Sequence, residues 1–281
     1  MCKNYIESFD FLGEKEIVGI SRLGRDIPLY HSGKDAKVLL VAGTHAREHV
    51  TCEVLKELAR EEGKGLSVDY LPLLNIDGVL LARYGLASVG NAFLRRKLVS
   101  LNKGSENFSL WKANAFGVDI NVNFNADWGE GKYNETIAGA ENYIGIAPQS
   151  EPETQCAVEV LKRKYSLVVS YHSLGEEIYW GYENNFRHYD VAKKYADHVG
   201  YKLKRSEHSC GGLKDYYALT NDGLGLTVEI GEETYGHPYP ENRIGLIMEK
   251  HRGSLKLLCQ LGEEIYDRIY AGSVFGGAKG V

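Results

Sequence analysis

Short apolar runs separated by amphipathic stretches predict that strands and helices alternate along this chain. The runs at Lys37–Ala42, Leu167–Tyr171 and Gly225–Ile230 are largely apolar, which is typical of strands buried on both faces of a sheet. A further strand is expected at Val68–Leu74. Each of these runs is short enough for a strand and too short for a typical helix.

Apolar residues at helical spacing lie between these strands. The expected helices are His49–Glu62, Glu151–Tyr165, Arg187–Val199 and a long helical region from Glu241 to Tyr270. Ser150 and Glu153 are predicted to open the second of them as a capping pair. Strands and helices that alternate in this way build an α/β fold, a mixed, mostly parallel twisted sheet with helices on both faces. The 281 residues suit one such unit, so residues 1–281 are expected to form a single domain.

The stretch from Asn91 to Tyr143 breaks this pattern. It is rich in Asn and Gly and has little periodicity. A loop of this length inside a compact domain is usually functional. We therefore expect it to shape a binding site.

Charge and composition exclude some classes of partner. The formal net charge is -5, and Lys and Arg are scattered without a basic run, so nucleic acid is not an expected partner. No apolar run approaches the roughly 20 residues of a membrane span. The N-terminus lacks a signal-peptide pattern, and the five cysteines are widely spaced without a CxxC pair. These features predict free thiols and a cytoplasmic location, although an exported protein trimmed of its signal would show the same pattern.

A candidate metal site lies where the first buried strand turns into a helix. His45 and Glu48 form an H-x-x-E pair at this turn, and residues three apart on a first helical turn share a face. His172 directly follows the apolar run LVVSY and is the candidate third ligand. Two His and one Glu leave one tetrahedral position open, the pattern of a catalytic zinc site. The prediction is one Zn²⁺ on these residues; the alternative is that the short H-x-x-E pair arose by chance.

Glu229 is a second carboxylate of interest. It lies inside the apolar stretch GLGLTVEIG, where burial without a partner is costly. One interpretation is a charge turned outward from an edge strand. The other is a general base beside a metal site, since ligands in open α/β sheets bind at the carboxyl ends of strands. Asp119 is in addition a candidate to hold a ligand imidazole from behind, with a plain turn as the alternative.

Several segments of the chain resemble, in order, those of the zinc carboxypeptidases, the carboxypeptidase A-like or funnelin family. These segments are GTHAREHVT (43–51), WKANAFGVDINVNF (111–124), SYHSLGEEIYW (170–180), SCGGLKDYY (209–217) and LTVEIG (226–231). The resemblance implies a metallocarboxypeptidase in which His45, Glu48 and His172 bind zinc. It also implies that Glu229 acts as general base and acid.

The same resemblance assigns substrate-binding roles and shows departures from the family. It implies that Asn121 binds the terminal carboxylate of a peptide substrate and that Arg47 lines the unprimed side. The arginine that follows this Asn in the family is Val122 here, so a charged clamp for the carboxylate is missing. Lys112 takes the place of the arginine that polarises the scissile carbonyl, and stabilises it only as a point charge.

A mobile aromatic hydroxyl of the family aligns with Glu207. We leave open whether Glu207 itself or one of three tyrosines takes that role. The three tyrosines are Tyr201, Tyr216 and Tyr217.

Lys214 and Asp215 fall where the family places the floor of its specificity pocket. Lys214 there favours a substrate carboxylate and Asp215 an amine, so a zwitterionic side chain such as that of meso-diaminopimelate is expected; the alternative for Lys214 is a solvated surface residue.

Further motifs look like the bacterial branch that hydrolyses γ-D-glutamyl-diaminopimelate bonds, which implies a muropeptide substrate. These motifs are VDINVNFNADWGEG, GAENYIG, SEPET and SYHSLGEEIYW. A general metallocarboxypeptidase, a related zinc deacylase acting on amidated amino acids, and a peptide-binding pseudoenzyme are the competing interpretations.

Overall fold

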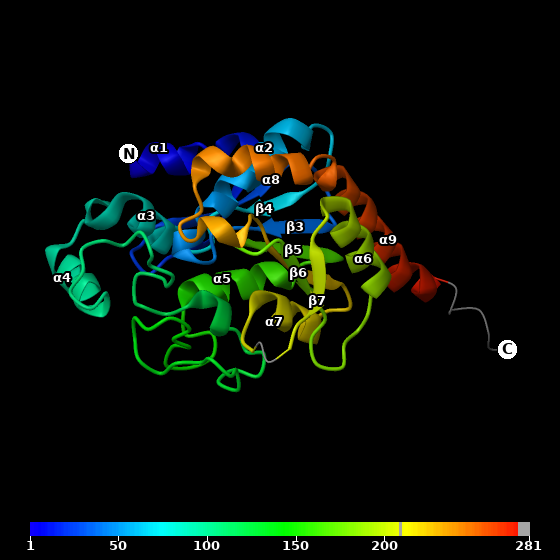
Figure 1. The fold of residues 1–281 in the computed structure, drawn as a ribbon. Coiled ribbons are helices and arrows are strands. Elements are labelled where there is room, and N and C mark those ends of the chain that lie inside the picture. The colour runs from blue at the N-terminus through cyan, green and yellow to red at the C-terminus, as the bar shows by residue number, and fades with distance from the viewer. Residues whose placement is uncertain (208–209, 275–281) are drawn as a thin grey trace.

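The centre of the fold is an eight-stranded sheet, seen in a computed structural model that describes residues 1–207 and 210–274 (Figure 1). The strands lie in the order β1-β2-β4-β3-β5-β8-β6-β7. Their bounds are β1 Glu14–Ile20, β2 Asp26–His31, β3 Val38–Val41, β4 Asp69–Leu71, β5 Leu167–His172, β6 Glu177–Trp180, β7 Lys202–Arg205 and β8 Leu224–Glu229. Ser209, the first residue of one family-like segment, lies outside the described residues.

Strands β4, β3, β5 and β8 run parallel at the middle of the sheet. The pairs β1–β2, β2–β4 and β6–β8 are antiparallel, and β6–β7 is parallel. The sheet is therefore mixed and mostly parallel, as the apolar runs predicted. All residues of β3 and β5 are buried, because the sheet is covered on both faces at this point.

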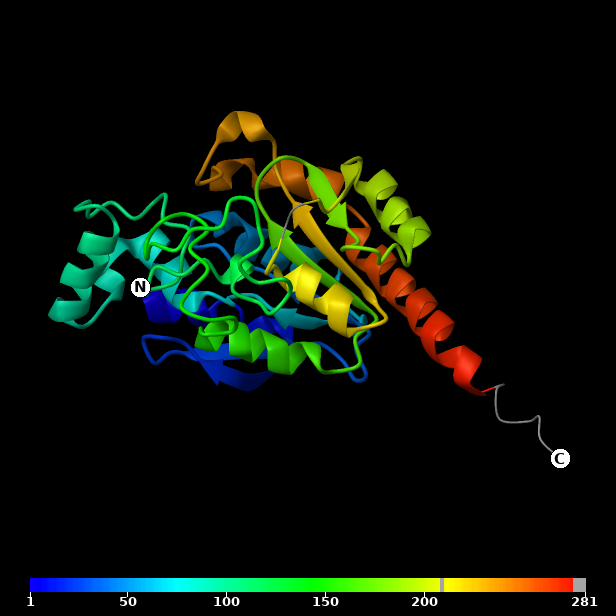
Figure 2. The same cartoon turned by 90° about the horizontal axis from the view of Figure 1, so that it is seen from below.

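Helices cover both faces of the sheet. Figures 1 and 2 show α2 and α8 on one side and α5 and α7 on the other. Helix α9 packs on β3 and β5, and α7 packs on β5 and β8. The helices are α1 Cys2–Glu7, α2 Val50–Glu62, α3 Ile76–Tyr84, α4 Ala92–Leu101, α5 Pro152–Leu161, α6 Tyr189–Val199, α7 Leu213–Thr220, α8 Ile244–Lys250 and α9 Ser254–Val274.

The predicted C-terminal helical region is divided in two. Between α8 and α9 the chain turns at Gly253, whose φ is +77°. The carboxylate of Glu62 accepts the N–H groups of Gly253 (2.5 Å) and Leu255 (2.9 Å). This side chain from α2 satisfies the first donors of α9, so a new helix begins where the pattern predicted one continuous region.

Two local predictions were wrong. The stretch from Asn91 to Tyr143 contains helix α4, which Asn91 caps by accepting the N–H groups of Phe93 and Leu94. Glu153 does not close a capping box with Ser150; its carboxylate accepts the backbone N–H of Arg22 (3.0 Å) instead. A tertiary partner outcompetes the local cap, so the helix boundary shifts.

Two features bear on the expectations from composition. All five cysteines carry free thiols, as predicted from their spacing. Among the described residues, no helix is both long and apolar enough to cross a membrane.

Candidate metal centre and active site

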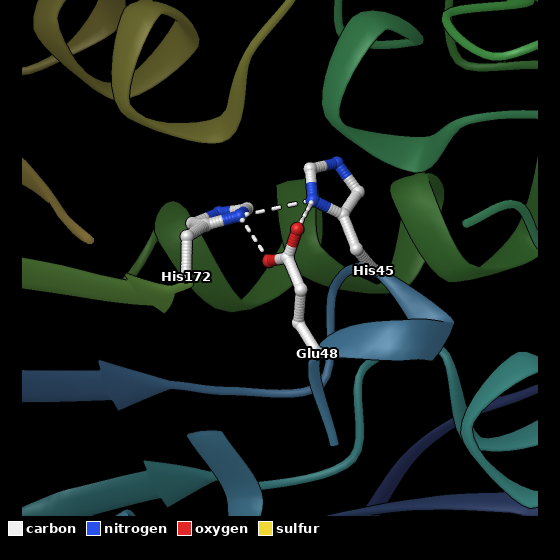
Figure 3. A group of neighbouring side chains, drawn as sticks. All are labelled: His45, Glu48 and His172. Carbon is white, nitrogen blue, oxygen red and sulfur yellow. Dashed lines mark hydrogen bonds and ion pairs between the residues drawn. The ribbon is translucent and has the colours of Figure 1, made fainter. Parts of the chain in front are cut away.

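The sheet topology brings the three candidate ligands together. After β3, the chain turns at Gly43 (φ +64°) into the 3-10 helix η2 Ala46–Glu48, with His45 as its N-cap. A Cβ at position 43 would lie 2.9 Å from the Cys52 sulfur, so this tight turn requires glycine. His172 is the last residue of β5, which pairs in parallel with β3. The carboxyl ends of both strands therefore meet, and the side chains of His45, Glu48 and His172 converge (Figure 3).

The three side chains fit a tetrahedral zinc ion. Nδ1 of His45 lies 2.9 Å from Oε1 of Glu48, Nδ1 of His172 lies 3.1 Å from Oε2, and the two Nδ1 atoms are 3.2 Å apart. Ligand atoms about 2.1 Å from a tetrahedral zinc lie about 3.4 Å from one another, so little adjustment would admit the ion. All three residues are buried. Within residues 1–207 and 210–274, no other group of His, Cys, Asp or Glu offers such a set.

Both imidazoles are held from behind, which leaves their Nδ1 atoms facing the shared point. Oδ1 of Asp119 lies 3.1 Å from Nε2 of His45, which confirms the predicted contact. Oγ of Ser170 lies 3.1 Å from Nε2 of His172. Such partners fix the ring orientation in metal sites. The sequence reading missed Ser170, although its place two residues before His172 on one strand puts both side chains on the same face.

The charges of this cluster compensate one another without a metal. Burial opposes the charge on Glu48, but the two imidazoles hold its pKa well below the ordinary value. Burial would lower the pKa of His45, but Glu48 and Asp119 outweigh burial and raise that pKa to about 9. Burial lowers the pKa of His172. A proton on His45 therefore supplies the positive charge that a metal cation would supply.

Glu229 lies beside the cluster, at the end of the neighbouring strand. It is the last residue of β8 and pairs in register with His172 of β5. Strand β8 lies between β5 and β6, so the interpretation of Glu229 as an outward charge on an edge strand is wrong. Burial, together with the negative charge of Glu48, raises the pKa of Glu229 to about 8. A carboxyl group whose pKa lies near neutral pH suits proton transfer beside a metal site.

Lys112 reaches the same region from the long loop. Its Nζ lies 2.8 Å from Oδ2 of Asp119 and donates to Oδ1 of Asn142 at 2.7 Å. Burial opposes its charge, but Asp119 outweighs burial and raises the pKa of Lys112. The ammonium group therefore stays charged beside the candidate metal site and retains a third N–H for a ligand.

The other proposed substrate contacts lie around the cluster. Arg47 forms a bidentate ion pair with Glu141, at 2.7 and 3.2 Å. Asn121 lines a cavity of about 190 Å³ together with His45 and Lys112. Its Oδ1 accepts the N–H of Leu213 at 3.1 Å. The sequence reading missed Glu141 and Asn142, because only the folded loop brings them to Arg47 and Lys112.

Lys214 and Asp215 line a second cavity of about 210 Å³, which also contains Glu229, Asn121 and Tyr179. Lys214 is 3% exposed, so its interpretation as a solvated surface residue is wrong. Its Nζ donates to the carbonyl oxygen of Gly181 (2.8 Å) and forms an ion pair with Asp215. The two side chains are thus paired with each other in the wall of the cavity.

The structure does not bring Glu207 or its tyrosine alternatives into either cavity. Glu207 is exposed and lines neither of them. Tyr217 is buried and donates to the carbonyl oxygen of Tyr165, and Tyr201 lies 3.3 Å from Nε2 of His251. Tyr216 packs against Phe124. A role for Glu207 at the reacting bond therefore has no support from this geometry.

Residues 3–252 of the chain match the zinc carboxypeptidase family. The chain belongs to this family. It is therefore a metallopeptidase, and the zinc dependence of the family agrees with the donor set of His45, Glu48 and His172.

Known members of the family show how far the similarity extends. The chain is 30% identical over 259 residues to γ-D-glutamyl-L-diamino acid endopeptidase 1 of Lysinibacillus sphaericus, covering 84% of this chain and 64% of that relative. In fold it is similar to bovine thrombin-activatable fibrinolysis inhibitor, at a TM-score of 0.70 and 18% identity over 95% of each chain. Carboxypeptidase A of Helicoverpa armigera gives a TM-score of 0.71 at 17% identity, over 94% of this chain and 71% of that one. The structures support the fold assignment alone.

We predict that zinc binding releases protons. Below pH 9 the metal-free protein carries a proton on His45, and zinc must displace it because only the neutral imidazole binds metal. At pH 7.5, the calorimetric enthalpy of zinc binding should vary with the ionisation enthalpy of the buffer. The slope should be between one and two protons, because a bound cation also disfavours the proton on Glu229, whose pKa is about 8 without the metal. His172→Ala should abolish binding. A buffer-independent enthalpy in the wild type, or full zinc content in His172→Ala, would contradict the assignment.

Proposed function

We propose that the protein hydrolyses the γ-D-glutamyl-meso-diaminopimelate bond of peptidoglycan peptides, with one zinc on His45, Glu48 and His172. The observation that carries the proposed substrate is the buried ion pair of Lys214 and Asp215, which lines one cavity with Glu229. The similarity to a γ-D-glutamyl-L-diamino acid endopeptidase supports the same substrate class.

The residues around the metal site divide the proton chemistry between them. A bound zinc ion supplies Lewis acidity and lowers the pKa of water. Glu229 accepts the proton of the attacking water and delivers it to the leaving amine. Without the metal, burial and Glu48 raise its pKa to about 8, and a bound cation beside it would lower that pKa, so that the carboxylate can accept a proton near neutrality. Lys112 donates its remaining N–H to the oxyanion that develops at the scissile carbonyl.

The ion pair explains why a zwitterionic side chain is favoured. A lone carboxylate or a lone ammonium placed beside Lys214 and Asp215 would leave one uncompensated charge in a buried wall, which is costly. The amino and carboxylate groups of a diaminopimelate side chain add no net charge. They pair with Asp215 and Lys214 respectively, so four charges alternate in the cavity.

Val122 stands where an arginine would bind a free C-terminal carboxylate, so this chain lacks that mode of substrate recognition. Where the family resemblance implies an arginine for the terminal carboxylate, this chain has a half-buried valine beside Asn121. A charged hydrogen bond contributes about 1.5–3 kcal/mol, so an ordinary free C-terminus should be bound less firmly. Recognition therefore shifts toward the side-chain pocket. Arg47, already paired with Glu141, is proposed to border the unprimed side.

Retention of the whole reacting set speaks against a pseudoenzyme. The three candidate ligands, their supporting contacts with Asp119 and Ser170, and Glu229 are all in place. A muropeptide is thus the proposed partner, as a substrate.

The role of Glu229 is tested by Glu229→Gln. This variant should keep its zinc and its fold but lose about 10²–10⁴-fold in kcat, because only proton transfer is removed. Glu159→Gln is a matched control, since Glu159 is an exposed glutamate that pairs with Lys162 and lines neither cavity. Turnover should be compared at equal zinc content. Wild-type turnover by Glu229→Gln would exclude Glu229 as the base.

The role of Lys214 is tested by Lys214→Met, which keeps the apolar stem and removes the charge. Asp215 still accepts the N–H of Gly212 in this variant, so its carboxylate keeps one donor. We expect kcat/KM for a γ-D-glutamyl-diaminopimelate peptide to fall by about 1.5–3 kcal/mol in transition-state stabilisation. The lysine analogue, which lacks the side-chain carboxylate, should lose much less. Equal losses on both substrates would mean that Lys214 does not bind that carboxylate.

A further inference from the structure

The cavity next to the candidate metal site raises the question of what replaces the missing guanidinium at Val122. Besides His45, Lys112 and Asn121, its lining includes Val122 and a turn of the long loop, Gly131, Tyr133 and Asn134. The turn is closed by a hydrogen bond from the Asn134 N–H to the carbonyl oxygen of Gly131 (3.0 Å). Segments far apart in the chain thus meet around one small space.

Asn134, which lines this cavity, has an unsatisfied donor. Its side-chain Nδ2 is buried and has no hydrogen-bond partner among residues 1–207 and 210–274. A buried N–H group without a partner is destabilising, and such groups in native proteins call for an explanation. A ligand oxygen in the cavity would supply the missing acceptor.

The amide of Asn134 is held in place by its own turn. A Cβ at Gly131 would lie 2.7 Å from Oδ1 and 3.0 Å from Cγ of Asn134, so the absence of a side chain there leaves room for this amide. Asn121 contributes a second amide. Because its Oδ1 already accepts the N–H of Leu213, its NH₂ group remains for a ligand.

The charges of the lining favour a neutral ligand group. Lys112 is the ammonium group of this cavity, and Asp119 balances it at 2.8 Å. Val122 contributes no charge. Two amide donors suit a carbonyl oxygen. An ionised carboxylate would lose hydration at a wall that offers it no guanidinium and whose ammonium group, Lys112, is already paired with Asp119.

We infer that Asn134, with Asn121, binds the carbonyl oxygen of a neutral amide on the residue that follows the scissile bond. The enzyme therefore accepts substrates in which that residue is amidated or continues into further peptide, and acts as an endopeptidase. This inference rests on the proposed peptidase function. It states that the proposed site accepts a neutral amide in the place where carboxypeptidases bind a free carboxylate.

The test uses peptides that share the γ-D-glutamyl bond and the diaminopimelate side chain. The three peptides differ in one group on the residue that follows the scissile bond. Its α-carbon, next to the amine that hydrolysis releases, carries a free carboxylate, a carboxamide or a hydrogen atom. In the wild type, kcat/KM for the carboxamide should equal or exceed that for the free acid. Asn134→Ala should lower the value for the carboxamide about 2- to 12-fold, the range of one neutral hydrogen bond, and leave the hydrogen analogue unchanged.

Two further variants complete the design. Asn125→Ala is the matched control, since Asn125 is an exposed asparagine of the same loop that does not line the cavity. It should change none of the three values. Val122→Arg should shift preference toward the free acid by about tenfold or more, because it restores a charged donor. The inference would be overturned if the wild type had a kcat/KM more than tenfold higher for the free acid than for the carboxamide. It would also be overturned if Asn134→Ala lowered kcat/KM equally for all three peptides.

A second series of three peptides carries the same three groups on an α-linked glutamyl peptide. It tests the proposed γ-glutamyl linkage separately from the proposed role of Asn134. Faster cleavage of the α-linked series would refute the γ-glutamyl assignment, while the ranking of acid and carboxamide would still test Asn134. If neither series is cleaved, calorimetric binding of the three peptides to zinc-loaded Glu229→Gln tests the same ranking. Tighter binding of the free acid there would also overturn the inference.

Discussion

The buried carboxylate of Glu48 is the constraint on which the rest of the site depends. It lies between two imidazoles at the carboxyl edge of the sheet and is 4% exposed. A carboxylate in this position requires positive charge, which either a protonated His45 or a divalent cation can supply. Asp119 and Ser170 then fix the rings, and Lys112 balances Asp119. The contacts of Glu48, His45, Asp119 and Lys112 thus form a series in which each charge is compensated by the next.

The parallel centre of the sheet makes this arrangement possible. Strands β3, β5 and β8 end side by side, so a turn after β3, the last residue of β5 and the last residue of β8 meet at one edge. The long loop and the segment before α7 then close the surroundings with two small cavities that share Asn121. The metal ligands and Glu229 lie on strand ends and on the turn after β3, whereas groups proposed to select the substrate lie on the long loop, in short 3-10 helices and at the start of α7. Elements outside the sheet can therefore change specificity without moving His172 or Glu229.

The central strands and the three candidate ligands could be predicted from sequence because their signals are local. An apolar run followed by His, and H-x-x-E after a strand, need no knowledge of distant residues. The edge strand β1 was not predicted, because its first three residues are charged and leave only a short apolar run, Ile17–Ile20, at its end. The contact of Lys112 with Asn142 depends on how the long loop folds, and the burial of the Lys214–Asp215 pair depends on how α7 packs on β5 and β8. A tertiary contact likewise decided the start of α5, where Arg22 binds Glu153.

X-ray absorption spectroscopy at the zinc edge, on protein loaded with one equivalent of zinc, tests the central claim most directly. The account predicts nitrogen and oxygen ligands at about 2.0–2.1 Å, with the multiple scattering of two imidazoles. The chain has five free cysteines, so thiolate ligation is a real alternative. A shell of sulfur atoms at about 2.3 Å, or the scattering of a single imidazole, would contradict a site made of His45, Glu48 and His172.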